Sequence, residues 1–199
     1  GNAERDYNAD RPWIEVSLGS PHANISYTAS EQHAVVPTVD SREVELFHQP
    51  MPTGYAGAEY VLLGDYELGT AKEDCQRIRI VVPDSVSLPR SPDAYAESLA
   101  TAGSDLSIGP KYRVVTGFVA PIDTGDRNGM VPELSDENRP AAEFYISPQA
   151  RLTNPENTWL HEYIHTRQTT TSKGWVAEGS ATYFTARYSV EAGWITPRE

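Results

Sequence analysis

The stretch His161-Glu162-Tyr163-Ile164-His165 constrains the fold of this chain more than any other feature of its sequence. Two histidines four residues apart lie about 40° from each other around an α-helix, one turn apart on the same face. Their imidazole rings can therefore converge on one metal ion. Glu162 stands beside that face, where it can accept a proton from a metal-bound water. The motif predicts a helix that carries a metal site.

The sequence around the motif favours a helix, although such a short pattern also arises by chance in a chain with five histidines. Asn154-Pro155-Glu156 is typical of a helix start, because Asn caps, Pro suits the first helical position and an acid favours the positive end of the helix dipole. We expect this helix to run to about Gln168. A polar turn at residues 169–173 and a second helix of about 15 residues, beginning at Gly174, should follow.

A third metal ligand is needed, because a catalytic zinc ion usually has three protein ligands and one open position. No histidine follows His165, and the acids that remain are Glu178, Glu191 and Glu199. A short turn would bring the start of the second helix, with Glu178, opposite the histidines. Glu191 lies more than three turns further on and is expected to be a solvated acid. An exposed, non-ligating Glu178 remains the alternative reading.

The motif and the sequence WVAEGSATY at residues 175–183 together resemble the gluzincin pattern, HExxH followed by WxxEGxAxY. This pattern occurs in zinc metallopeptidases of the aminopeptidase-N and thermolysin-like superfamily and in its small peptidase MA-like members. The resemblance covers roughly residues 76–190. It implies that zinc is held by His161, His165 and Glu178, and that Glu162 is the general base in the hydrolysis of peptide bonds.

The resemblance also implies a fold and some differences from the family. The family fold has a twisted mixed sheet whose edge strand lies along the substrate, and residues 142–147 are the candidate for that strand. The GxMEN motif of the aminopeptidases is replaced here by residues 140–144, so recognition of a free substrate amine is not implied. Only 12 residues separate His165 from Glu178, fewer than is usual.

The end of the chain differs from the family as well. Only 21 residues follow Glu178, and the family takes a group that stabilises the transition state from well beyond that glutamate. Tyr183 and Tyr188 are the remaining candidates, and we expect both to pack instead. The far side of the cleft is therefore expected to be incomplete. A non-catalytic zinc-binding interaction domain that keeps the peptidase fold is the alternative function.

The rest of the chain predicts an α+β fold with an N-terminal β-rich layer. Residues 1–75 form a β-rich segment, since short stretches of alternating polarity recur between residues 13 and 66. The resemblance implies that residues 76–199 form a zincin-like metallopeptidase domain. Its predicted elements are a strand at 77–82, a helix at 92–102, a strand at 112–120, a loop at 122–139, a strand at 142–147 and the two helices.

Composition narrows the partners of the chain. The formal net charge is −12, so nucleic acid and anionic membrane surfaces are not expected to bind. No apolar run approaches the roughly 18 residues of a membrane span. Cys75 is the only cysteine, which excludes an intrachain disulfide, and we expect it to be partly buried. A peptide or protein substrate is expected, in an extracellular or membrane-anchored ectodomain whose targeting segment is absent from this sequence.

Overall fold

The chain forms two compact units, residues 1–67 with 83–85 and residues 68–82 with 86–199. The predicted domain boundary between residues 75 and 76 stays a prediction. The structure is a computed structural model. It describes six strands between residues 13 and 63, and then residues 66–84, 86–106, 112–120, 128–131, 141–150, 157–168 and 174–198.

The first unit contains two antiparallel sheets in its described residues. One has the strand order β1-β6-β5-β4, and the other is the hairpin β2-β3. The alternating stretches of the sequence correspond to β1, β2, β4 and β6, whereas β3 and β5 were not predicted individually. The bounds are β1 (Trp13–Glu15), β2 (Asn24–Ala29), β3 (Gln32–Pro37), β4 (Arg42–Val44), β5 (Gly54–Ala56) and β6 (Tyr60–Leu63).

The second unit is built on a mixed five-stranded sheet of order β10-β11-β9-β8-β7. Strands β8, β9 and β11 are parallel to one another, and β10 is antiparallel to β11. β9 is buried from Val115 onward and β8 from Ile80 onward, as expected of parallel strands inside a sheet. The bounds are β7 (Tyr66–Glu73), β8 (Gln76–Pro83), β9 (Val114–Val119), β10 (Gly129–Met130) and β11 (Ala141–Ile146).

The turn between β7 and β8 contains Cys75, whose burial differs from the prediction. It consists of Asp74 and Cys75, and Asp74 has a φ of 44°, a left-handed conformation that Asp tolerates in tight turns. Cys75 is exposed, so the prediction of a partly buried thiol is wrong. The reason is geometric, because a two-residue turn at the tip of a hairpin leaves its side chains in solvent.

The predicted edge strand is not at the edge of the sheet. β11, which corresponds to residues 142–147, lies between β9 and β10. The outer neighbour β10 pairs through Gly129 with Ile146 and through Met130 with Tyr145. The sequence analysis placed these two residues in a loop, because a two-residue strand leaves no periodic pattern. The short strand β10 is therefore the outermost described strand on this side.

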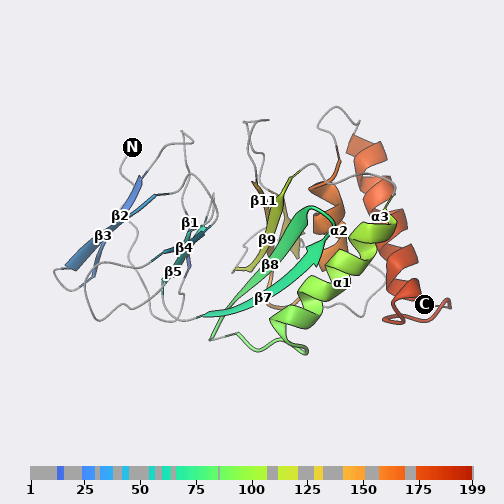
Figure 1. Cartoon of the computed structure of the whole chain (residues 1–199), viewed down its shortest axis with the longest axis horizontal. Helices are drawn as coiled ribbons and strands as arrows, with labels where there is room; N and C mark the ends of the chain where they lie inside the picture. The colour runs from blue at the N-terminus through green and yellow to red at the C-terminus, as the bar shows by residue number, and fades with distance from the viewer. Residues whose placement is uncertain are drawn as a thin grey trace. The chain divides into compact units, whose positions relative to one another are not determined.

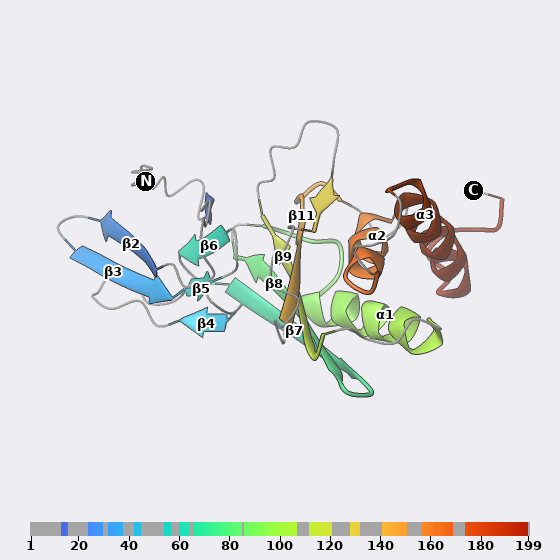
Figure 2. The same ribbon diagram turned by 90° about the horizontal axis from the view of Figure 1, so that it is seen from above.

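Three helices, α1 (Pro92–Asp105), α2 (Thr158–His165) and α3 (Gly174–Glu191), complete the second unit. Figures 1 and 2 show them on one side of the five-stranded sheet, with α2 between the sheet and α3. Helix α1 begins as predicted, since the Ser91 side chain accepts a hydrogen bond from the backbone N–H of Ala94. The α+β class is thus confirmed. Among the described residues, no helix has the length and apolar character needed to cross a membrane.

Helix α2 begins later than its sequence suggested. Its N-cap is Asn157, whose side-chain oxygen accepts a hydrogen bond of 3.2 Å from the N–H of Leu160. The helix start predicted at Asn154 lies outside the described residues, and Asn157, three residues later, offers the same capping chemistry. Residues 151–156 lie outside the described part of the chain. The helix has only eight residues and ends at His165.

The faces of α2 that do not carry the histidines are buried, as expected. Trp159, Leu160, Tyr163 and Ile164 have no exposed surface. The Trp159 ring lies 4.5 Å from the Tyr95 ring of α1, centroid to centroid, and it meets the Phe144 ring of β11 edge-on. These contacts hold α2 against both α1 and the sheet. The same contacts determine the direction in which the histidine-bearing face of α2 points.

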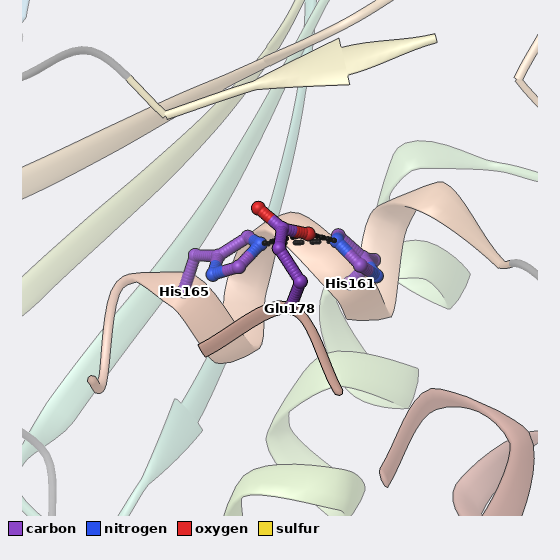
Figure 3. Close-up of side chains that lie close together, drawn as sticks. All are labelled: His161, His165 and Glu178. Atoms are coloured by element: carbon purple, nitrogen blue, oxygen red, sulfur yellow. Dashed lines mark hydrogen bonds and ion pairs between the residues drawn. The ribbon is translucent and has the colours of Figure 1, made fainter. Parts of the chain in front are cut away.

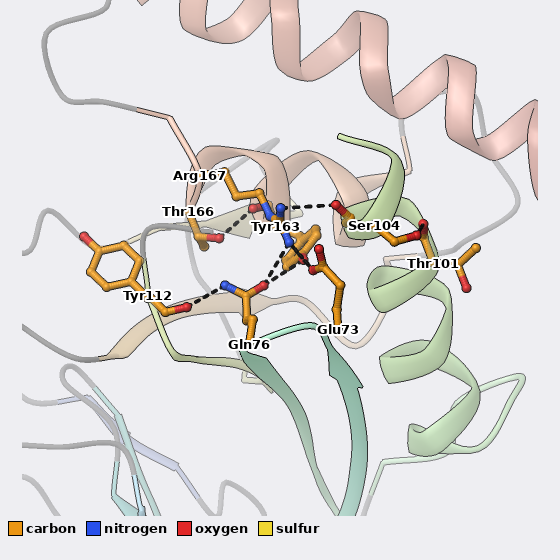
Figure 4. A network of polar contacts seen from close by, with 9 residues as sticks. Glu73, Gln76, Thr101, Ser104, Tyr112, Tyr163, Thr166 and Arg167 are labelled. Carbon is orange, nitrogen blue, oxygen red and sulfur yellow. Dashed lines mark hydrogen bonds and ion pairs between the residues drawn. The ribbon is translucent and has the colours of Figure 1, made fainter. Parts of the chain in front are cut away.

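A buried polar network anchors the end of α2 (Figure 4). Arg167, just beyond the helix, pairs with Glu73 of β7 and donates from Nη1 to the carbonyl of Gly103, at 3.2 Å. The Tyr163 hydroxyl lies 3.0 Å from Glu73 Oε2 and 2.8 Å from Gln76 Oε1. Burial raises the pKa of Tyr163 above its usual value, so its hydroxyl remains a donor. The network joins α2 to the β7–β8 hairpin and to α1.

We predict that Glu73→Gln strongly destabilises the fold. The amide keeps the shape of the side chain but removes the charge that faces buried Arg167. Leaving one buried charge without its partner should lower the free energy of unfolding by about 3–5 kcal/mol, measured by urea denaturation. Glu191→Gln is the matched control, since it breaks the exposed pair with Arg187 and should have a much smaller effect. Equal effects of the two substitutions would contradict the anchoring role of the network.

Candidate metal centre

Three predicted ligand residues meet at one point between α2 and α3 (Figure 3). The Nε2 atoms of His161 and His165 lie 3.0 Å apart. Glu178 Oε2 lies 3.1 Å from the first of these nitrogens and 3.5 Å from the second. The carboxylate thus reaches the two imidazoles from the neighbouring helix. The described residues bring together a group of side chains that can hold a metal ion.

The spacing of these three atoms fits a metal ion. Donors at about 2.0–2.2 Å from a tetrahedral ion lie roughly 3.4 Å from one another. The observed separations of 3.0–3.5 Å bracket that value. Two imidazoles and one carboxylate suit several divalent transition metals. The geometry therefore indicates where a metal can bind, but it does not select one metal. Three protein donors leave a coordination position for water or substrate.

The centre is accessible from solvent. The exposed fraction is 22% for the His161 side chain, 17% for His165 and 65% for Glu178. Glu178 is therefore exposed, as the alternative interpretation of a non-ligating helix acid predicted. Its carboxylate nevertheless points toward both imidazoles. A water molecule or a substrate carbonyl can approach the metal position from the exposed side.

The donors come from the end of α2 and from the beginning of α3. His161 and His165 are on the last five residues of α2, and Glu178 is the fifth residue of α3. The helices α2 and α3 are in contact. Helix α3 is 18 residues long, slightly longer than the 15 expected. The order of the helices and the position of Glu178 near a helix start agree with the sequence analysis.

Glu162 follows His161 directly in α2, and its side chain lies against β10 at the edge of the described sheet. Its side chain is mostly buried, with 7% of the residue exposed. Gly129 of β10 passes so close that an added Cβ would lie 2.8 Å from Glu162 Oε1 and 2.6 Å from Thr158 Cγ2. Only glycine fits this approach without displacement of Glu162. The backbone of β10 therefore forms one wall around the carboxylate.

Tyr183, Tyr188 and Glu191 were also considered as site residues from the sequence. Tyr188 is buried and its ring stacks on Phe184, as expected. Tyr183 is 62% exposed, so the expectation that it packs is wrong. Glu191 is exposed at the end of α3 and pairs with Arg187, in agreement with its reading as a solvated acid.

Three residues that shape the site were not predicted from the sequence. Gly129 lines Glu162, and Asn157 starts the helix. Gln168 contacts the ring of His165 through a hydrogen bond of 2.7 Å. Gln168 carried a usable signal, because a polar residue three positions after a histidine lies near the same helix face. Asn157 has the capping chemistry that the sequence offered at Asn154, whereas Gly129 is defined by a contact with Glu162 that no local pattern shows.

Comparison of the sequence with known proteins found no matching family model and no curated protein of significant similarity. The chemistry of the centre therefore rests on its own residues. Those residues are two histidines, one exposed glutamate and one buried glutamate on two packed helices.

We predict that the purified protein binds one zinc ion per chain. His161→Ala or His165→Ala should remove it, because each substitution deletes one of three donors. Metal content after dialysis, measured by mass spectrometry, tests this. The control Glu191→Ala changes an exposed acid of α3 outside the centre and should leave the metal content unchanged. The site would be refuted by equal zinc content in the wild type and in both histidine variants.

Proposed function

We propose that this chain is a zinc-dependent peptidase of the gluzincin type, which hydrolyses peptide bonds. His161, His165 and Glu178 hold the metal, and Glu162 is the general base. The observation that carries the proposal is the convergence of three donor atoms within 3.5 Å of one another. A buried carboxylate, Glu162, directly follows the first histidine in α2. A purely structural site would need no base beside it and would be closed to water.

The proposed hydrolysis assigns different roles to Glu162 and Glu178. Zinc, when bound, polarises the scissile carbonyl and makes a bound water more acidic. Glu162 accepts the proton of that water and passes it to the leaving amine. Glu178 contributes negative charge and a third donor from the second helix. Their different burial supports these different roles.

The surroundings of Glu162 support its role as the base. Its backbone is fixed in α2 beside His161, and the close backbone of Gly129 limits the positions that its side chain can take. A carboxylate held in one orientation needs less reorganisation when the proton moves. The wall formed by β10 also keeps bulk water from that side of the carboxylate.

The edge of the sheet supports a peptide as the substrate. β10 is the outermost described strand on its side of the sheet, and it passes directly over Glu162. An extended peptide that pairs with the outer edge of β10 would run past the metal centre. Backbone pairing of this kind recognises a peptide chain with little dependence on its side chains. The proposed substrate is therefore an extended segment of a peptide or protein.

We predict opposite phenotypes for the two glutamates. Glu162→Gln should keep zinc and lower the rate of hydrolysis by about 10²–10⁴-fold, because an amide cannot accept the proton of water. Glu178→Gln should weaken zinc binding, because a neutral amide oxygen is a poorer donor. Hydrolysis of a mixed library of quenched fluorescent peptides and zinc content measured on the same samples separate the two effects.

Two outcomes would overturn the proposal. If Glu162→Gln lost zinc while Glu178→Gln kept it, the roles of the two residues would be reversed. If the wild type held one zinc per chain and cleaved no peptide of the library, the chain would instead be a zinc-binding interaction domain.

A further inference from the structure

Gln168 links the two helices that carry the metal ligands. Its Oε1 lies 2.7 Å from Nδ1 of His165. Its Nε2 donates to the carbonyl of Ala177, at 2.8 Å, and to the hydroxyl of Ser180, at 2.9 Å. Ala177 immediately precedes Glu178 in α3. One side chain therefore contacts both a histidine ligand and the turn of α3 that carries the carboxylate.

The partners of Gln168 fix the orientation of its amide. A backbone carbonyl can only accept, so the atom that faces Ala177 must be the NH₂ group. The atom that faces His165 is then the oxygen, which can only accept. Nδ1 of His165 must therefore carry a proton. In a neutral imidazole, this leaves Nε2 without a proton and with its lone pair available for a metal.

The Ser180 hydroxyl completes the arrangement. It donates to the carbonyl of Ala177, at 3.1 Å, so its oxygen is free to accept from Gln168. No donor faces a donor in this set of contacts. The bonds act across the two helices directly and do not depend on residues 169–173, which lie outside the described part of the chain.

We propose that Gln168 is a positioning residue of the metal centre. It holds His165 in the tautomer that presents Nε2, and it holds the turn of α3 from which Glu178 reaches the same ion. This inference rests on the proposed metal site, but it does not depend on peptidase activity. Partners that orient a ligating histidine typically account for 10–100-fold in metal affinity.

Three variants separate the two parts of the role. Gln168→Leu removes every hydrogen bond at nearly constant size. Gln168→Glu keeps an acceptor for Nδ1–H of His165 but loses the NH₂ donor to Ala177. Gln149→Leu is the matched control, because Gln149 is an exposed glutamine that contacts Ser147 outside the centre.

Two measurements on the metal-free protein test the proposal. Competition with a chelating dye gives the Kd for zinc, and long-range ¹H–¹⁵N spectra of the histidine rings give the tautomer of His165. The wild type should show the Nδ1–H form. Gln168→Leu should lose this preference and raise the Kd by 10–100-fold, with its thermal unfolding little changed. Gln168→Glu should keep the tautomer and bind zinc with intermediate affinity, and Gln149→Leu should match the wild type.

The proposal would be overturned by an Nε2–H tautomer of His165 in the wild type. It would also be overturned if Gln168→Leu, or Gln168→Glu should the first variant not fold, bound zinc within about twofold of the wild type. A wild type that binds no zinc refutes the metal site and this inference together. If the wild type binds zinc tightly, Gln168→Leu binds it weakly and no peptide is cleaved, then the positioning role stands and the peptidase proposal fails.

Discussion

The candidate centre depends on the burial of one very short helix. Eight residues are too few to form a stable helix in water, so α2 exists because its other faces are packed. Trp159 fills the space between α1 and the sheet, and Arg167 pairs with Glu73 in a region closed to solvent. These contacts fix the rotation of α2 about its axis. With α2 held in this orientation, His161 and His165 face α3.

The sheet and the third helix then supply what α2 lacks. Strand β10 brings the backbone of Gly129 against the side chain of Glu162, which follows His161 in α2. Helix α3 brings Glu178 to the same point, and Gln168 joins the two helices at that level. Each part is held by a different kind of interaction: apolar packing, a close backbone approach and hydrogen bonds. The convergence of the three parts is what makes the centre chemically specific.

The sequence predicted the parts that follow from local periodicity, and it missed those that follow from tertiary contact. The spacing of His161 and His165 determines one helix face, and the strand at residues 77–82 is evident from its apolar run. By contrast, Arg167 meets Glu73 across 94 residues of sequence, and nothing local to either residue signals that pairing. The two-residue strand β10 was missed because it is too short to leave a periodic pattern. Glu178 could be proposed because a metal requires a third donor and because residues 175–183 resemble the gluzincin pattern.

The most direct test of the account is X-ray absorption at the zinc edge, on protein loaded with one equivalent of the metal. Donors spaced as His161, His165 and Glu178 are here should give about four nitrogen or oxygen neighbours at roughly 2.0–2.1 Å, with outer scattering from two imidazole rings. That result would establish the metal centre on which the proposed chemistry depends. A six-coordinate oxygen environment without imidazole scattering, or zinc that is lost on desalting, would contradict it.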